Sequence, residues 1–517
     1  CATDRRILPI PEDPLRSPAR IRKPLVLGAG ALCLGLAFAP FPFRLLALVA
    51  LVPLVGVVDH APSCGRAFLW GWLFGGLAAG LHLFWVWFLV VPVEPVTRIL
   101  LNLGVVLLFA YLGLYVGVFA LVVRRLGLWS APLVWAVLEF VRSRTQIAFP
   151  WDLLGYTMTP VRPFVQLASI GGVFLVSAWV VLVNVLVYGL LVGPARRRLA
   201  LGLVLVLLGP VLYCRATVRP TGTGFRVAIV QPNVSPLDKG DWESRERIQA
   251  DLVRLTGRAA EQRPDLVLFP ETATLVDVTR SSTIGPVLRQ LVDSLGIEIL
   301  TGTPLRDEQR GTWHNGAVLL RPGEWPPSQR YHKMRLVPFS EKIPYADEVP
   351  LLKKLLGTQD MGDWARGHTY TVFELSRTRA AVLVCYEAIF PDLCREFVNR
   401  GAQVLANVTN DGWFGQLLGA QQHAELAVMR TVENGVPMIR SANNGISFIV
   451  DPFGRVLKRT RLFTQDVLVG DVPAARGPTL YRRFGDWFIG LSVAVLFGAV
   501  IIRRVRRGRR PAGASSV

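Results

Sequence analysis

The sequence is poor in charge, cysteine and histidine. Only 18% of its 517 residues are charged, whereas 51% are hydrophobic, and the mean hydropathy is +0.40. This composition excludes an ordinary soluble protein of this length and indicates a membrane protein with a soluble part. The six cysteines contain no C-x-x-C pair and the six histidines no H-x-x-x-H spacing, so neither a disulfide framework nor a metal site is predicted.

The sequence contains long apolar runs. They lie at about 24–40, 43–58, 66–91, 98–123, 130–145, 163–192, 197–214 and 485–502. Because ~20 helical residues cross a bilayer core, these runs predict a polytopic α-helical bundle of about eight spans. The chain then divides into an N-terminal arm (1–23), a seven-span region (24–214), a soluble domain (215–484), an eighth span (485–502) and a basic tail (503–517).

The net charge of +20 is concentrated around the spans. Residues 215–484 carry 34 basic and 29 acidic side chains, a net +5, and the rest of the chain carries +15. This distribution indicates topology signals and contact with lipid headgroups, and it argues against nucleic acid as a partner.

The loop charges also predict an orientation. With the N-terminus inside, short basic loops alternate correctly, since cytoplasmic loops retain Lys and Arg. The basic groups then on the inner face are Arg20–Lys23, Arg66, Arg124–Arg125, Arg196–Arg198 and Arg503–Arg507. Residues 215–484 are therefore expected on the extracytoplasmic face, and the tail inside.

Strand-like and helical patterns alternate within residues 215–484. Strands are predicted at Phe225–Gln231, Leu266–Phe269, Glu298–Gly302, Asn315–Leu320, Val404–Asn407 and Met438–Ser441, and helices near 243–263, 284–295 and 421–433. This alternation is typical of a layered α/β domain.

Three reactive side chains follow predicted strands. The apolar run Val382–Val384 ends in Cys385, the run Leu266–Phe269 precedes Glu271, and Lys333 follows a third short segment. A thiol presented at a strand end, with a carboxylate and an amine, suits nucleophilic acyl chemistry. Each also has an ordinary interpretation: a carboxylate at a helix N-terminus, a solvated loop cation and a small core residue.

Glu, Lys and Cys in this order resemble the triad of the nitrilase, or carbon-nitrogen hydrolase, superfamily. Within it, the span bundle and the longer motifs are similar to those of the apolipoprotein N-acyltransferases, over nearly the whole chain. The motifs are Phe269–Ala273, Tyr331–Lys333, Leu336–Glu341, Cys385–Glu387, Asn407–Gly415, Gln422–His423, Met429–Arg430 and Arg440–Gly445. Ser340 departs from the glycine more usual there. The resemblance implies an α-β-β-α sandwich between spans seven and eight.

The resemblance also implies catalytic roles. Cys385 would be the nucleophile, Glu271 the base, and Lys333 the cation that stabilises thiolate and oxyanion. Glu341 and Glu387 would be supporting carboxylates: Glu341 would position Lys333 or act in proton transfer, and Glu387 would orient Lys333 or an incoming amine. The alternative is that both form plain salt bridges.

Further residues would lie around the nucleophile. Tyr386 would lie beside it, and the loop from Asn410 with Trp413 and Phe414 resembles the aromatic gates over the acyl entry, as does Trp242. Aromatic side chains at a lipid–water boundary also serve simply as anchors.

The activity implied is transfer of a phospholipid acyl chain to the N-terminal amine of diacylglyceryl-cysteine on bacterial apolipoproteins, through a thioester. No metal or organic cofactor is implied, and the location would be the bacterial cytoplasmic (inner) membrane. Two alternatives stay open. A membrane-tethered amidase would use the same triad with water, and a transporter or lipid-binding scaffold would carry an inactive domain.

Overall fold

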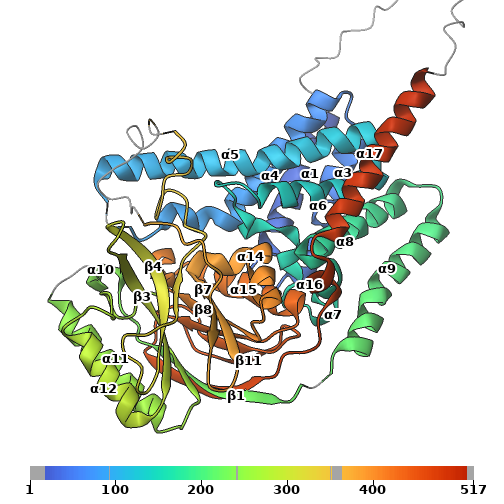
Figure 1. Ribbon diagram of the computed structural model, residues 1–517. Coiled ribbons are helices and arrows are strands. Elements are labelled where there is room, and N and C mark those ends of the chain that lie inside the picture. The colour runs from blue at the N-terminus through green and yellow to red at the C-terminus, as the bar shows by residue number, and fades with distance from the viewer. Residues whose placement is uncertain are drawn as a thin grey trace, which may run out of the picture.

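The computed structural model describes residues 18–91, 93–219, 221–239, 243–349, 351 and 364–508. A bundle of apolar helices lies along one side of a domain built from two β-sheets (Figure 1). The chain builds most of the bundle first, then the domain, and returns to the bundle with its last helix.

The bundle contains helices of very different length. They are α1 (Pro18–Leu36), α2 (Ala47–Ala50), α3 (Val52–Asp59), α4 (Cys64–Leu83), α5 (Pro95–Leu126), α6 (Ala131–Arg142), α7 (Arg162–Val165), α8 (Ala168–Val192), α9 (Arg196–Thr217) and α17 (Trp487–Gly508), with 3₁₀ turns η1 (Arg44–Leu46), η2 (Phe84–Phe88), η3 (Leu128–Ser130), η4 (Pro150–Asp152) and η5 (Leu154–Met158). Among the described residues, five helical segments are long and apolar enough to cross a membrane: 64–88, 95–126, 168–192, 196–217 and 487–505. The protein is a membrane protein, and the count of eight spans stays a prediction.

Three of the predicted spans are short or broken. The run at 43–58 forms η1, α2 and α3 in succession, and α6 has only 12 residues. The run at 163–192 is interrupted at Gly171 and Gly172, where Gly172 has φ +71°. A left-handed residue cannot continue a right-handed helix, so α8 has a new N-terminus at Val173.

The domain contains two six-stranded sheets. One has the order β12-β1-β2-β3-β4-β5 and the other β11-β10-β9-β8-β7-β6. The first is formed by β1 (Thr223–Gln231), β2 (Leu266–Leu268), β3 (Glu298–Asp307), β4 (Thr312–Leu320), β5 (Arg330–His332) and β12 (Asp466–Pro473); the second by β6 (Val372–Glu374), β7 (Arg379–Val384), β8 (Val404–Thr409), β9 (Met438–Ala442), β10 (Phe448–Val450) and β11 (Val456–Arg459). β7, β8 and β9 run parallel, so their carboxyl ends share one edge.

Two helix layers cover the sheets. Within the described residues, the domain helices are α10 (Pro236–Lys239), α11 (Ser244–Ala260), α12 (Ile284–Leu295), α14 (Pro391–Asn399), α15 (Gly419–Asn434) and α16 (Leu480–Phe484), with η6 (Cys385–Ile389) and η7 (Asp411–Phe414). Helices α11 and α12 pack outside the first sheet, and α14 and α15 lie between the second sheet and the bundle (Figure 1). The α-β-β-α order agrees with the predicted sandwich.

The hydrophobic core is continuous between bundle and domain. One cluster of buried residues includes Trp85 and Phe174 of the bundle together with Val382, Leu405 and Met429 of the domain. Polar bonds join the two parts as well: Arg44 pairs with Glu425 at 2.5 Å, and the Glu433 carboxylate accepts the Val173 amide at 2.9 Å. The latter bond caps the new N-terminus of α8.

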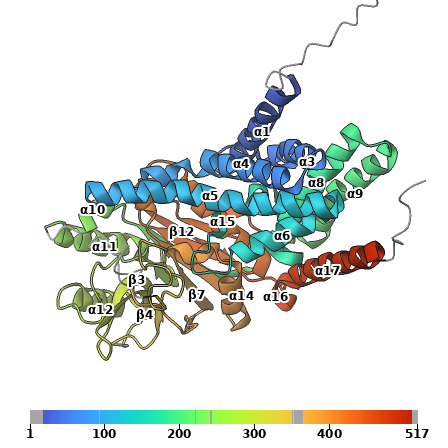
Figure 2. The same cartoon turned by 90° about the horizontal axis from the view of Figure 1, so that it is seen from above.

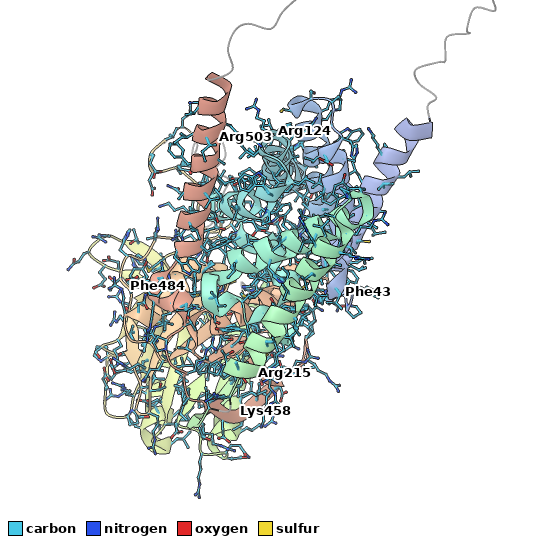
Figure 3. All side chains as sticks on the ribbon, turned by 90° about the vertical axis from the view of Figure 1, so that its right-hand side faces the viewer. Phe43, Arg124, Arg215, Lys458, Phe484 and Arg503 are labelled. Carbon is cyan, nitrogen blue, oxygen red and sulfur yellow. The ribbon has the colours of Figure 1, made fainter. Side chains whose placement is uncertain are left out.

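The basic loops of the bundle lie at one end. Arg503 near the end of α17 donates to the carbonyl oxygens of Arg125 and Leu126 at the end of α5. Figure 3 shows Arg124 and Arg503 at the end remote from the sheets, the exposed Phe43 and Phe484 at a middle level, and Arg215 and Lys458 on the side of the domain. Helices α9 and α17 are separated by α6 and α8 (Figure 2).

Candidate active site

Cys385 lies at the carboxyl end of β7, where the chain turns sharply into η6. Its φ is +50°, a left-handed value that is uncommon for a residue with a side chain. Such conformations persist only where surrounding contacts hold them, and they are concentrated at functional sites. The turn carries the thiol at the sheet edge that the sequence predicts.

Lys333 and two carboxylates form a buried cluster. Lys333 Nζ lies 2.9 Å from Glu341 Oε1 and 3.7 Å from Glu271 Oε1, and the Lys333 side chain is only 1% exposed. Asn315 Nδ2 donates to Glu271 Oε1 at 2.8 Å and to Glu341 Oε1 at 3.0 Å. One lysine and one amide therefore hold both carboxylates in fixed positions.

Backbone amides complete the two carboxylates. Glu271 Oε2 accepts the amide of Asn410 at 2.9 Å, and Glu341 Oε2 accepts the amide of Val337 at 2.8 Å. Asn410 thus enters the site through its backbone, while its side-chain oxygen accepts from Asn443. Glu341 contacts Lys333 directly, and its role in positioning that lysine stays a prediction.

Electrostatics keep the resting lysine charged and the thiol neutral. Burial alone would lower the pKa of Lys333, but the charges of Glu341 and Glu271 outweigh it and raise that pKa above its usual value. Burial, helped by the charge of Glu271, raises the pKa of the Cys385 thiol to about 12, although Lys333 opposes the shift. Attack therefore needs a base that removes the thiol proton as the reaction proceeds.

The raised thiol pKa predicts an unusual alkylation profile. In a variant that keeps Cys385 and has alanine at the other cysteines, the rate of reaction with iodoacetamide should still rise through pH 10. A peptide covering residues 380–390 should level off near the ordinary thiol pKa of ~8.5. Mass spectrometry of the modified Cys385 peptide gives both rates. A plateau of the folded protein below pH 9 would contradict this electrostatic description.

Glu387 is buried and binds backbone amides beside Cys385 and after Lys333. Its Oε1 accepts Tyr331 Oη at 2.7 Å and the amides of Met334 at 2.7 Å and Arg335 at 3.0 Å, and its Oε2 accepts the Val384 amide at 2.8 Å. Burial raises its pKa. Glu387 therefore orients the segment after Lys333 through the backbone. With its side chain fully buried and these four donors around it, it is not presented to an incoming amine.

The predicted aromatic residues lie at different depths. Tyr386 is buried and donates to the carbonyl of Ala148 in the bundle at 2.8 Å. Phe414 packs against Trp85 and Trp151 of the bundle, with ring centroids 5.0 and 5.6 Å away. Trp413 is 37% exposed. Trp242 lies outside the described residues.

Several polar residues of this site were not predicted as site residues. Besides Asn315, a fully buried network of Asn407, Asp411, His423 and Arg440 lies behind the Cys385 backbone. Lys239 of α10 donates to the carbonyl of Glu271 at 3.0 Å, and burial lowers its pKa to about 8. The sequence signal for the network was Arg440 inside the apolar strand Met438–Ala442, because an isolated buried charge requires a partner.

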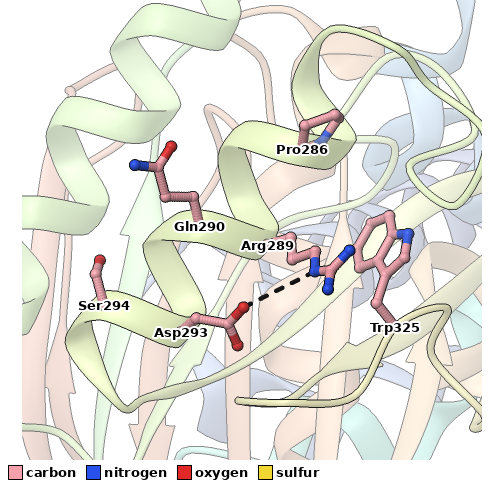
Figure 4. A pocket seen from close by; sticks show the side chains of 6 residues that line it. All are labelled: Pro286, Arg289, Gln290, Asp293, Ser294 and Trp325. Atoms are coloured by element: carbon pink, nitrogen blue, oxygen red, sulfur yellow. Dashed lines mark ion pairs between the residues drawn. The ribbon is translucent and has the colours of Figure 1, made fainter.

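A surface hollow of about 540 Å³ lies elsewhere on the domain. It is lined by Pro286, Arg289, Gln290, Asp293, Ser294 and Trp325, with an ion pair of 3.8 Å between Arg289 and Asp293 (Figure 4). None of the predicted site residues lines it, so it is separate from the cluster around Cys385.

Comparison with known proteins identifies the family. Residues 226–479 match the model of the carbon-nitrogen hydrolase family, and residues 30–186 match the apolipoprotein N-acyltransferase N-terminal domain. The apolipoprotein N-acyltransferase of Geobacter metallireducens is 34% identical over 91% of this chain and 92% of its own length, and that of Pseudomonas aeruginosa is 32% identical over 94% and 97%. The chain belongs to the apolipoprotein N-acyltransferase family. It is an N-acyltransferase enzyme with a carbon-nitrogen hydrolase domain.

Among solved structures, this chain is similar to an amidase from Nesterenkonia. The match has 21% sequence identity and a TM-score of 0.37, and it covers 50% of this chain and 92% of the amidase.

Proposed function

We propose that this enzyme moves an acyl chain from a membrane phospholipid to the N-terminal amine of diacylglyceryl-cysteine on bacterial apolipoproteins, by way of a thioester on Cys385. The observation that carries the proposal is the cluster of Lys333, Glu271 and Glu341 beside a strained thiol at the sheet edge that faces the bundle. Family membership supports the acceptor, since the relatives are named for apolipoprotein N-acylation.

The first half-reaction forms the thioester. Glu271 takes the thiol proton while sulfur attacks the sn-1 ester carbonyl of the phospholipid, and the negative charge that develops on oxygen is stabilised by Lys333. Collapse breaks the ester C–O bond. The leaving alkoxide takes a proton from Glu271, and a lysophospholipid departs.

The second half-reaction consumes the thioester. The α-amine of the acceptor attacks the same carbonyl and Glu271 accepts the amine proton. The C–S bond then breaks, and the leaving thiolate takes that proton from Glu271 to return the thiol. Glu341 holds Lys333 in position throughout, and Glu387 holds the backbone that carries it. Because one site handles both lipid substrates in turn, a membrane-level location suits the reaction.

The aromatic residues between bundle and domain are proposed to border the acyl chain. Phe414 and Tyr386 are joined to bundle residues, and Trp413 is partly exposed beside them, its carbonyl accepting the amide of Val90. Asn410 supports the loop that presents Trp413 and Phe414. Trp242 is proposed as a further contact.

Intact mass of the purified enzyme tests the function. Incubation with a diacyl phospholipid should add one acyl mass to the peptide that contains Cys385, and a diacylglyceryl lipopeptide should then remove it and become N-acylated. Release of free fatty acid at the same rate with and without lipopeptide would instead identify a hydrolase. Absence of any adduct under single-turnover conditions would contradict the thioester route.

The enzyme is proposed to lie in the cytoplasmic membrane with residues 215–484 outside, between spans seven and eight. In a variant without reactive thiols, Ser328→Cys should react with an impermeant maleimide in intact spheroplasts, because Ser328 is exposed on the domain. The control Ala195→Cys, at the start of the basic loop before α9, should react only after lysis. The opposite labelling pattern would place residues 215–484 on the cytoplasmic side, where an extracytoplasmic apolipoprotein could not reach them.

A further inference from the structure

His423 connects the nucleophile to the bundle. It belongs to α15, its side chain is fully buried, and its Nε2 lies 3.2 Å from the carbonyl oxygen of Cys385. On its other side, Nδ1 lies 2.9 Å from Asp411 Oδ1 and 3.1 Å from Arg440 Nη2. The imidazole also stacks on Trp151 of the bundle, with ring centroids 5.2 Å apart.

The partners of the imidazole show how it can bind the Cys385 carbonyl. Nε2 faces only that carbonyl, an acceptor, so a hydrogen bond between them requires the proton on Nε2. Nδ1 lies between an acceptor, Asp411 Oδ1 at 2.9 Å, and a donor, Arg440 Nη2 at 3.1 Å, and Arg440 also pairs with Asp411 at 2.8 Å. Burial and the neighbouring charge of Arg440 lower the pKa of His423, although Asp411 opposes them, and this agrees with a neutral ring.

The carbonyl that His423 binds controls the direction of the nucleophile. A peptide unit is planar, so a bond to the Cys385 oxygen fixes the orientation of the whole Cys385–Tyr386 unit. Asn407 Nδ2 donates to the same oxygen at 3.5 Å, and Asn407 Oδ1 accepts from Arg440. The left-handed φ of Cys385 needs such external contacts to persist.

We propose that His423, held by Asp411 and Arg440 and stacked on Trp151, is a positioning residue that aligns the Cys385 thiol for attack. This inference rests on the proposed function, because it assumes that Cys385 is the nucleophile. His423 acts through the backbone of Cys385. It contributes geometry, and its neutral ring adds no charge to stabilise a thiolate.

The role predicts a split between two reactions of the same thiol. Attack on a bound ester requires alignment, and a misplacement of ~1 Å can cost about 10²-fold in rate. Alkylation by a small reagent requires only an accessible thiolate. His423→Leu should therefore slow single-turnover thioester formation about 10²-fold, while its iodoacetamide rate and alkylation pH profile stay close to those of the parent enzyme.

A conservative variant should restore the function. Glutamine can offer an acceptor oxygen to Arg440 and a donor N–H to the Cys385 carbonyl, which is the pattern of the neutral imidazole. His423→Gln should therefore load the acyl chain much faster than His423→Leu. The asparagine side chain is one methylene shorter than that of glutamine, so His423→Asn should load as slowly as His423→Leu. It provides a second test if His423→Leu does not fold.

Asn434 supplies a matched control. It belongs to the same helix, α15, is equally buried, and donates to the carbonyl of Arg430 at 2.9 Å. Asn434→Leu should lower the thermal unfolding temperature as His423→Leu does, yet leave the ratio of loading to alkylation unchanged. The proposal is overturned if His423→Leu loads at the parent rate, if His423→Gln is no better than His423→Leu, or if alkylation falls in parallel with loading. If the proposed function itself is wrong and Cys385 does not form the thioester, the result differs: the acyl adduct persists in Cys385→Ala.

Discussion

Replacing Cys385 with alanine is expected to abolish both the acyl adduct and all turnover. The thiol is the nucleophile in the proposed route, and the only other cysteine in the neighbouring elements, Cys394, is fully buried in α14. The loss should exceed any effect of substituting a supporting residue, because alanine can form no thioester. Intact mass after incubation with phospholipid measures the adduct, and N-acylation of a lipopeptide measures turnover.

Cys394→Ala is the control for this variant. Burial raises the pKa of Cys394, and its side chain belongs to the apolar core, so the thiol is an inert packing group. Loading and turnover should stay near the parent values, with only a modest loss of stability. If Cys385→Ala retained a full acyl adduct, Cys385 would not be the attacking group.

Glu271→Gln is expected to slow thioester formation by about 10²–10⁴-fold, the usual contribution of a general base. An amide cannot remove the proton of a thiol whose pKa burial raises to about 12. The glutamine NH₂ group would also face a donor in place of an acceptor, because Asn315 Nδ2 and the Asn410 amide each donate to one oxygen of this carboxylate. Single-turnover loading from phospholipid, followed by transfer to a lipopeptide, measures each half-reaction, and both should fall.

Glu298→Gln is the control for this variant, because it removes a buried negative charge at a position away from Cys385. Glu298 is 8% exposed, against 6% for Glu271, and it pairs with Arg321 at the opposite end of the parallel strands. Glu298→Gln should load at nearly the parent rate. Rapid loading by Glu271→Gln would show that another group removes the thiol proton. Glu341, 2.9 Å from Lys333, would be the first candidate.

Local patterns in the sequence were enough to predict much of the domain. The helix predicted near 284–295 is α12, the strand predicted at 266–269 is β2, and Glu271, Lys333 and Cys385 follow strands as expected. These features depend on apolar periodicity and strand ends, which neighbouring residues determine. The interruption at Gly171–Gly172 had a local signal too, although hydropathy alone treated the run as continuous.

Contacts between distant segments could not be predicted in the same way. Asn315 meets Glu271 across 44 positions of the chain, and the network behind Cys385 combines residues from β8, η7, α15 and β9. The apolar neighbours of Arg440 within its strand indicate that it is buried, but only the three-dimensional arrangement shows that Asp411 pairs with it. For the same reason, the sequence predicts that Glu387 orients Lys333 or an incoming amine, whereas its partners in the structure are three backbone amides and the Tyr331 hydroxyl.

The position of α15 has a consequence for how this chain is synthesised. The helix is buried over its whole length between the second sheet and α8, with Glu433 bound to the Val173 amide. Since a growing chain emerges from its N-terminus, α1 to α9 leave the ribosome before α15 exists. The bundle can thus act as a template on which the last layer of the sandwich assembles. Residues 215–484 expressed alone would expose the apolar surface of that layer and should aggregate.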